Sequence, residues 1–178
     1  ILYLGVRLTL CTMNMRLKGN WRDALGKSLL LGGLLLCTAC VALGQTPIVL
    51  DPPAGTVDGV NVINGSTVIV QLRAPGKDYV HLRGDFNNFT STNGSLMRKS
   101  VDGNRHWLQV NGLSPGIWYR YHFMVEGNLE VGDPYAQLVL DPWNDQYIPQ
   151  SHFPGMPSFP TGQANWHTTA FRTDNPYF

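Results

Sequence analysis

The sequence predicts an all-β protein whose central part, residues 66–133, is an antiparallel β-sandwich. Two observations predict this fold. Short segments alternate between apolar and polar residues in steps of two, as on strands with one buried face, and turn residues separate the segments. No apolar pattern with a helical period extends over a useful length. Roughly seven short strands in a stretch of this size are typical of an immunoglobulin-like sandwich.

The first two predicted strands lie in residues 66–76 and 78–86. In the first, β-branched residues and leucine recur at every second position before a Pro-Gly turn: Val68, Val70 and Leu72. In the second, Val80 and Leu82 share one face, and the polar run that begins at Gly84 indicates a turn. Each strand is therefore expected to bury one face.

The next two predicted strands lie in residues 106–116 and 117–128. Leu108 and Val110 share a face in the first. The second alternates most clearly, with one face formed by Ile117, Tyr119, Tyr121, Phe123 and Val125, and the other by Trp118, Arg120, His122 and Met124. The sequence Glu126-Gly127-Asn128 then predicts a hairpin turn into a short strand at 129–131.

Two irregular segments flank the predicted sandwich. Residues 45–65 are rich in Pro, Gly and Asp and are expected to form a lead-in segment. Residues 134–178 contain seven of the 12 prolines, several aromatic residues and no periodicity. They predict an extended Pro- and aromatic-rich arm that docks on a surface outside this chain, and the chain is expected to be truncated before a further domain.

The first 44 residues predict export. Residues 15–44 combine a basic start, an apolar stretch from Ser28 and small residues before Gln45, which is the pattern of a cleaved signal peptide. The mature form is thus expected to have no transmembrane segment and to be periplasmic, surface-bound or extracellular. Lipoprotein processing at Cys40 remains an alternative. Residues 1–14 fit neither pattern and are interpreted as non-native upstream translation.

Charge and cysteine content exclude several function classes. The chain has 13 Lys/Arg and 12 Asp/Glu, but residues 1–44 hold five of the former and one of the latter. The remainder is weakly acidic, which argues against a nucleic-acid partner. All three cysteines precede Gln45, so the body is expected to have neither a disulfide nor a thiolate metal site. No cofactor is expected.

The tripeptide Arg83-Gly84-Asp85 is an apparent cell-adhesion signal. However, Arg83 ends an alternating strand, and Asp85, Asn87 and Asn88 are residue types whose side chains bond to nearby backbone groups in turns. We therefore interpret the tripeptide as a strand-to-turn junction.

Several segments, in this order, carry a family resemblance: "APGKDYVHLRGDFNNF", "WLQVNGLSPGIWYRYHFMVEG", "VGDPYAQLVLDPWNDQYI" and "FPGMPSFPTGQ". Together they resemble the N-terminal domain of bacterial alpha-amylase family glycoside hydrolases, of the Bacteroidetes type. That domain is an early-set immunoglobulin-like sandwich, similar to the carbohydrate-binding module of glycogen branching enzymes. The resemblance covers roughly residues 68–178 and implies a catalytic (β/α)8 barrel after this segment, as a partner of the sandwich.

The resemblance also implies where an alpha-glucan such as starch or glycogen would bind. Relatives place a tryptophan, a lysine and a second aromatic residue where this chain has Phe89, His122 and Leu129. Phe89 keeps a smaller stacking ring, His122 keeps a donor, and Leu129 loses the ring. Trp118 and Arg120, on the same strand face as His122, complete the carbohydrate-binding candidates.

Three hypotheses follow for the function. The first is a non-catalytic domain that supports the barrel of a secreted alpha-glucan-acting hydrolase, with weak glucan contact. The second is a true starch- or glycogen-binding module, and the third is the N-terminal domain of a secreted esterase. The chain offers no serine nucleophile elbow, and most of its carboxylates stand in turns, so no catalytic residue is expected here.

Overall fold

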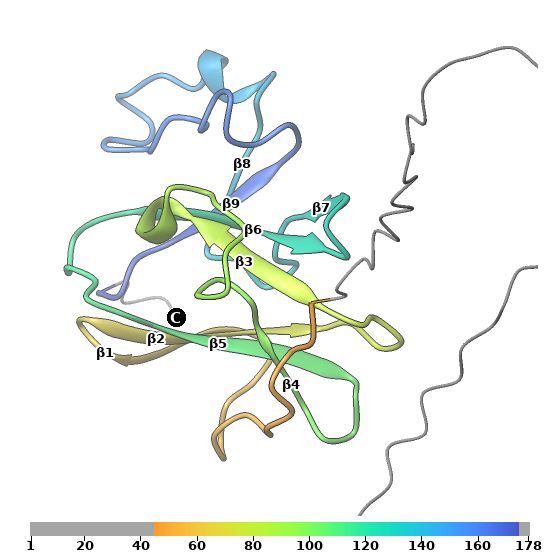
Figure 1. The fold of residues 1–178 in the computed structure, drawn as a ribbon. Helices are drawn as coiled ribbons and strands as arrows, with labels where there is room; N and C mark the ends of the chain where they lie inside the picture. Colours follow the sequence, from red (N-terminus) through yellow and green to blue (C-terminus); the bar gives the residue numbers. More distant parts are fainter. Residues whose placement is uncertain (1–44, 175–178) are drawn as a thin grey trace, which may run out of the picture. The chain divides into compact units, whose positions relative to one another are not determined.

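The computed structural model describes residues 45–174, which form two antiparallel sheets packed face to face (Figure 1). The predicted upstream segment 1–14 and signal peptide 15–44 lie outside the described residues. The β-sandwich that the alternating pattern predicts is confirmed. In this part of the chain, strands and turns predominate, and the helical elements are two short 3-10 turns, η1 (Asp85–Asn87) and η2 (Asp145–Tyr147).

The first sheet has the strand order β1-β2-β5-β4. Its strands are β1 (Gly59–Asn64), β2 (Thr67–Arg73), β4 (Arg98–Lys99) and β5 (Arg105–Asn111). β2 and β5 pair along their whole length, with Val70 opposite Leu108. Because paired residues point to the same side of a sheet, the predicted apolar faces of both strands meet the second sheet.

The second sheet has the order β3-β6-β9-β8, and β7 pairs with β6. Its strands are β3 (Val80–Gly84), β6 (Tyr119–Val125), β7 (Leu129–Val131), β8 (Leu138–Leu140) and β9 (Thr168–Phe171). The predicted hairpin between β6 and β7 is confirmed: Val125 pairs with Leu129 across the loop Glu126-Gly127-Asn128, in which Glu126 and Gly127 have positive φ values of 50° and 75°. Because β6 pairs with β3, β7 and β9, it is the central strand of this sheet.

The core lies between the sheets and holds the residues that the alternation assigned to buried faces. Its buried apolar members include Val68, Val70, Leu72, Val80, Leu82, Tyr121, Phe123, Val125 and Phe171. The Tyr121 ring lies edge-on to both Phe123 and Phe171, with centroids 6.0 Å and 5.4 Å away. Such edge-to-face contacts add to the free energy gained from burial.

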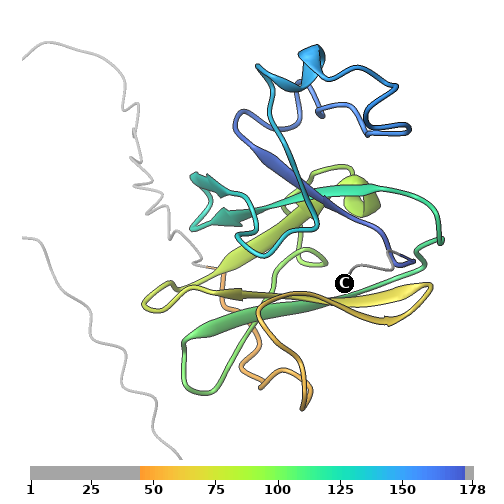
Figure 2. The same cartoon turned by 180° about the vertical axis from the view of Figure 1, so that it is seen from behind.

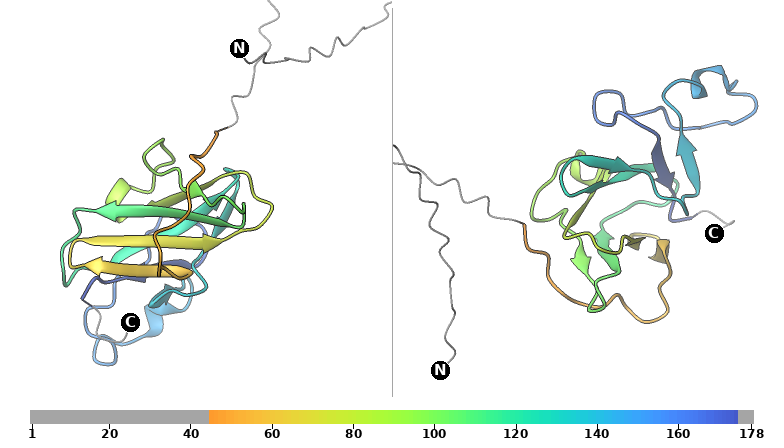
Figure 3. Two further views of the ribbon diagram at one scale, coloured as in Figure 1. Left: turned by 90° about the horizontal axis from the view of Figure 1, so that it is seen from below. Right: turned by 90° about the vertical axis from the view of Figure 1, so that its right-hand side faces the viewer.

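The predicted lead-in segment, residues 45–65, contains β1 and also covers the first sheet. Residues 48–50 lie beside β4, where Lys99 N donates to Ile48 O and Leu50 N donates to Lys99 O. The segment then crosses the outer face of this sheet (Figure 3, left), where Leu50 O accepts from Trp107 Nε1 at 2.7 Å. Trp107 on that face is buried, so its indole N–H needs a hydrogen-bond acceptor, and this segment supplies one.

The predicted arm, residues 134–178, also differs from the structure. Its ends form β8 and β9, and Leu140 and Phe171 are fully buried. Between them, residues 141–167 form an irregular loop that we call the β8–β9 excursion. It lies on the side of the second sheet away from the first (Figures 1 and 2). The arm therefore packs on its own sandwich. Arg120 on β6 donates to a backbone carbonyl of the arm, and Glu130 on β7 accepts from a backbone N–H of the arm, so part of its irregular backbone is hydrogen-bonded.

Candidate functional site

The strand-to-turn junction after β3 is held by one amide side chain. Asn87 Oδ1 accepts from Gly84 N at 2.9 Å, and Asn87 Nδ2 donates to Leu82 O at 2.8 Å. Gly84 is required because a Cβ at this position would lie 2.6 Å from Arg120 O. Asn88 and Phe89 then adopt the left-handed conformation, with φ of 52° and 54°, which is costly for a bulky residue such as Phe89.

Asp85 binds Arg120 within the domain. Asp85 Oδ2 accepts from the backbone N and from Nε of Arg120, at 2.8 Å and 3.0 Å, and Asp85 Oδ1 accepts from Nη2 at 2.7 Å. This paired contact raises the pKa of the Arg120 guanidinium. The acidic group of the Arg-Gly-Asp tripeptide is therefore bound by Arg120 on β6, whereas the sequence predicted that it bonds to backbone groups of the turn, as Asn87 does.

Phe89 and His122 lie together but do not face solvent. Phe89 is 2% exposed and His122 is 0% exposed, and their ring centroids are 5.4 Å apart. Arg83 Nε donates to Phe89 O, which fixes the backbone of the turn against β3. A pyranose needs an open aromatic face, so the predicted stacking role of Phe89 and donor role of His122 do not fit this structure.

His122 is buried beside one carboxylate. Its Nδ1 lies 3.9 Å from Glu130 Oε1, and neither ring nitrogen has a hydrogen-bond partner among the described residues. Burial lowers the pKa of His122 to about 4, although the charge of Glu130 opposes this and that of Arg83 adds to it. The histidine is therefore neutral at physiological pH.

Trp118 and Arg120, the other two candidates, contact the excursion, and Trp118 also contacts Arg172, which follows β9. The Trp118 ring lies edge-on to Phe153, with centroids 6.3 Å apart, and the Arg172 guanidinium lies 5.6 Å from its centroid. Arg120 Nη1 donates to Ser158 O at 3.0 Å. The structure thus brings the four predicted residues to one side of the second sheet, where they hold the turn and the excursion.

The excursion is anchored a second time through β7. Glu130 Oε1 accepts from Asn165 N at 3.0 Å and from Trp166 N at 3.2 Å. Pro160 and Ala164 of the excursion are also buried. His122, which points away from the core, therefore lies beside a carboxylate that binds the excursion.

The excursion itself carries an aromatic cluster that the sequence did not assign to a site: Trp143, Trp166 and His167. The Trp143 ring centroid lies 6.1 Å from that of Trp166 and 5.6 Å from that of His167. Asp141 Oδ1 accepts from Trp143 N at 2.8 Å and fixes the backbone at the start of the cluster. Trp143 and Trp166 are far apart in the sequence, and only the folded chain brings their rings together.

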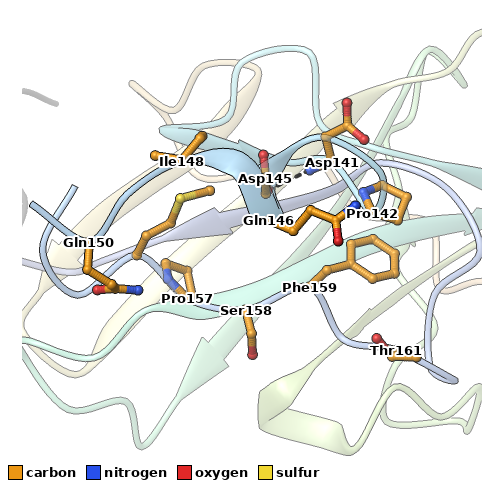
Figure 4. Close-up of a pocket in the computed structure, with 11 residues that line it drawn as sticks. Asp141, Pro142, Asp145, Gln146, Ile148, Gln150, Pro157, Ser158, Phe159 and Thr161 are labelled. Atoms are coloured by element: carbon orange, nitrogen blue, oxygen red, sulfur yellow. Dashed lines mark hydrogen bonds between the residues drawn. The ribbon is translucent and has the colours of Figure 1, made fainter. Parts of the chain in front are cut away.

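A pocket of about 430 Å³ lies in the same loop (Figure 4). Polar and apolar side chains line it, among them Asp141, Gln146, Ile148, Gln150 and Phe159. The Asp141 carboxylate also faces His167 Nε2 at 3.6 Å. A hydrogen bond from Asn144 is the main cause of its lowered pKa, so Asp141 is ionised at neutral pH.

The carboxylates of the described residues act mainly in turns and hydrogen bonds. Asp133 is 3% exposed and accepts from the Tyr121 hydroxyl at 2.6 Å, and burial raises the pKa of both groups. Within residues 45–174, no three His, Cys, Asp or Glu side chains come together as a metal site would require. Nor does any helix in this part of the chain have the length and apolar character needed to cross a membrane.

No family model and no curated protein matches this sequence. Solved structures with a similar part include the Group B Streptococcus pullulanase SAP in complex with maltotetraose, at 19% identity and a TM-score of 0.42, over 65% of this chain and 14% of that protein. Apo pullulanase from Paenibacillus barengoltzii is 22% identical, with a TM-score of 0.36, over 49% of this chain and 14% of that one.

A third similar structure is the catalytic module of the glycogen-degrading pneumococcal virulence factor SpuA, in complex with an inhibitor. It is 23% identical, with a TM-score of 0.36, over 55% of this chain and 15% of that one. This chain therefore spans only a small part of the length of each of these three proteins. The assignment of the fold rests on the sheets described above.

Proposed function

We propose that this chain is the non-catalytic N-terminal domain of an exported alpha-amylase family hydrolase and that it supports the catalytic barrel. The ordered motifs from "GDFNNF" to "DPWND" support the family, and the two-sheet fold agrees with them. The pattern of residues 15–44 supports export.

One observation favours support over sugar binding at the face implied by the family resemblance. Phe89 and His122 occupy the positions of two ligand groups, and both are buried, with their rings close to each other. Binding of a sugar there would require these two buried rings to become exposed, with the loss of the free energy gained from their burial. Side chains that are buried in this way contribute to packing of the domain and are not open to a sugar.

The test begins by sequencing the gene beyond the codon for Phe178. We expect it to encode a (β/α)8 barrel, and the purified full-length product to release reducing sugar from amylopectin. Deletion of residues 45–174 from that product should lower the midpoint of thermal inactivation of the hydrolase. An esterase domain after Phe178, or a hydrolase whose thermal inactivation is unaltered by the deletion, would overturn the proposal.

A further inference from the structure

The excursion exposes two large aromatic side chains that the support role leaves unexplained. Trp143 is 49% exposed and Trp166 is 60% exposed. Their rings touch, with planes inclined at 62°. Apolar side chains that gather on a surface mark a place where something binds more often than isolated ones do.

Carboxylates hold the backbone of both tryptophans in place before any ligand arrives, and the two rings contact each other. Asp141 Oδ1 accepts from Trp143 N at 2.8 Å, and Glu130 Oε1 accepts from Trp166 N at 3.2 Å. His167 contacts the Trp143 ring and faces the same Asp141. A site whose aromatic groups are already ordered loses less conformational entropy on binding, so its contacts contribute more to affinity.

Polar side chains lie next to this aromatic pair. Asp141 belongs both to the network beneath Trp143 and to the wall of the pocket of about 430 Å³, within the size range of small-molecule sites. The amides of Gln146 and Gln150 line the same pocket, and Gln150 makes no hydrogen bond with any described residue. Carboxylate and amide groups of this kind bind the hydroxyl groups of a ligand.

We propose that Trp143 and Trp166 form a binding platform for an alpha-linked glucan, separate from the buried face at Phe89. Exposed rings beside carboxylate and amide groups suit a pyranose, which has an apolar C–H face and a rim of hydroxyls. The 62° inclination suits a curved alpha-linked chain, whereas a flat beta-linked chain would stack on coplanar rings. The choice of glucan as the natural ligand rests on the proposed function.

The test uses the full chain and two probes, maltoheptaose and cellohexaose, in titrations followed by calorimetry and tryptophan fluorescence. Maltoheptaose should bind and alter the fluorescence, and cellohexaose should bind at least tenfold more weakly. Trp143→Ala and Trp166→Ala should each weaken maltoheptaose binding at least tenfold. Tyr135→Ala is the matched control, since Tyr135 is also an exposed aromatic residue but lies outside the excursion, and it should leave binding unchanged.

Each variant is first checked by urea unfolding, because an unaltered midpoint shows that its fold is intact. No maltoheptaose binding by the parent chain, or equal loss in the Tyr135→Ala control, would overturn the platform. Equal affinity for cellohexaose would overturn the alpha-linked assignment. A dimer that both tryptophan variants dissociate, without sugar binding, would show a self-association surface instead. None of these outcomes depends on a barrel after Phe178, which tests the proposed function separately.

Discussion

Acid should destabilise this domain through its buried histidines. His106 and His122 are fully buried, and burial is the main cause that lowers the pKa of each from 6.5 to about 4. The charge of Lys99 adds to the shift at His106. His81 shifts in the same direction, mainly through burial. In each case the unfolded chain binds a proton at a pH where the folded chain does not.

The sign and size of the effect follow from these pKa values. Well above pH 6.5 these histidines are neutral in both states and add no pH dependence to the free energy of unfolding. As the pH falls from 6.5 toward 4, the unfolded state takes up protons and the free energy of unfolding decreases. At pH 5 the loss is about 2 kcal/mol for each of the two histidines, a large share of the roughly 5–15 kcal/mol of a typical domain.

Urea unfolding of the full chain at pH 7.5 and pH 5 measures this loss. We expect the parent to lose about 4 kcal/mol between the two values from His106 and His122 together. His106→Leu should reduce that loss by about 2 kcal/mol, because it removes one titrating group from the core. His152→Gln is the control at an exposed histidine and should leave the loss unchanged. Equal stability at both pH values, or an unaltered loss in His106→Leu, would refute the reasoning.

Three substitutions test the hydrogen bonds and close contacts of the second sheet. Gly84→Ala should cost about 2 kcal/mol or more, since its Cβ would clash with Arg120 O; an unchanged thermal midpoint would contradict this. Asp85→Asn should cost about 1–2 kcal/mol in urea unfolding by weakening the contact with Arg120, whereas a stabilised variant would show that the pair does not help. Tyr121→Phe should cost about 1–3 kcal/mol by leaving the buried Asp133 without its hydroxyl donor, a view that equal chemical stability would exclude.

The alternation in β6 shows how far the sequence could predict the fold. It placed Tyr121, Phe123 and Val125 in the core correctly, because a strand has only two faces and one of them must be buried. It also implied that His122, on the other face, would be accessible. That expectation failed because the sequence pattern of a strand does not reveal what covers its outer face.

The segment on the outer side of this sheet, the excursion, has no periodicity, so the sequence held little evidence for its position. The prolines of residues 134–178 exclude long regular elements, which led to the expectation of an arm docked elsewhere. β8 and β9 have only three and four residues, too few for a period to be recognised. Their pairing depends on contacts between residues far apart in the chain, such as Leu140 with Thr168.

By itself the sequence determined the sandwich, the junction at Gly84 and Asp85 and the hairpin at Glu126, because these depend on local alternation and turn chemistry. Only the tertiary structure decided which aromatic residues meet solvent. It buried Phe89 beside His122 and brought Trp143 against Trp166. Exposure is a property of the whole packed chain, so a ring that a motif marks as a ligand group can be closed off by residues far away in the sequence.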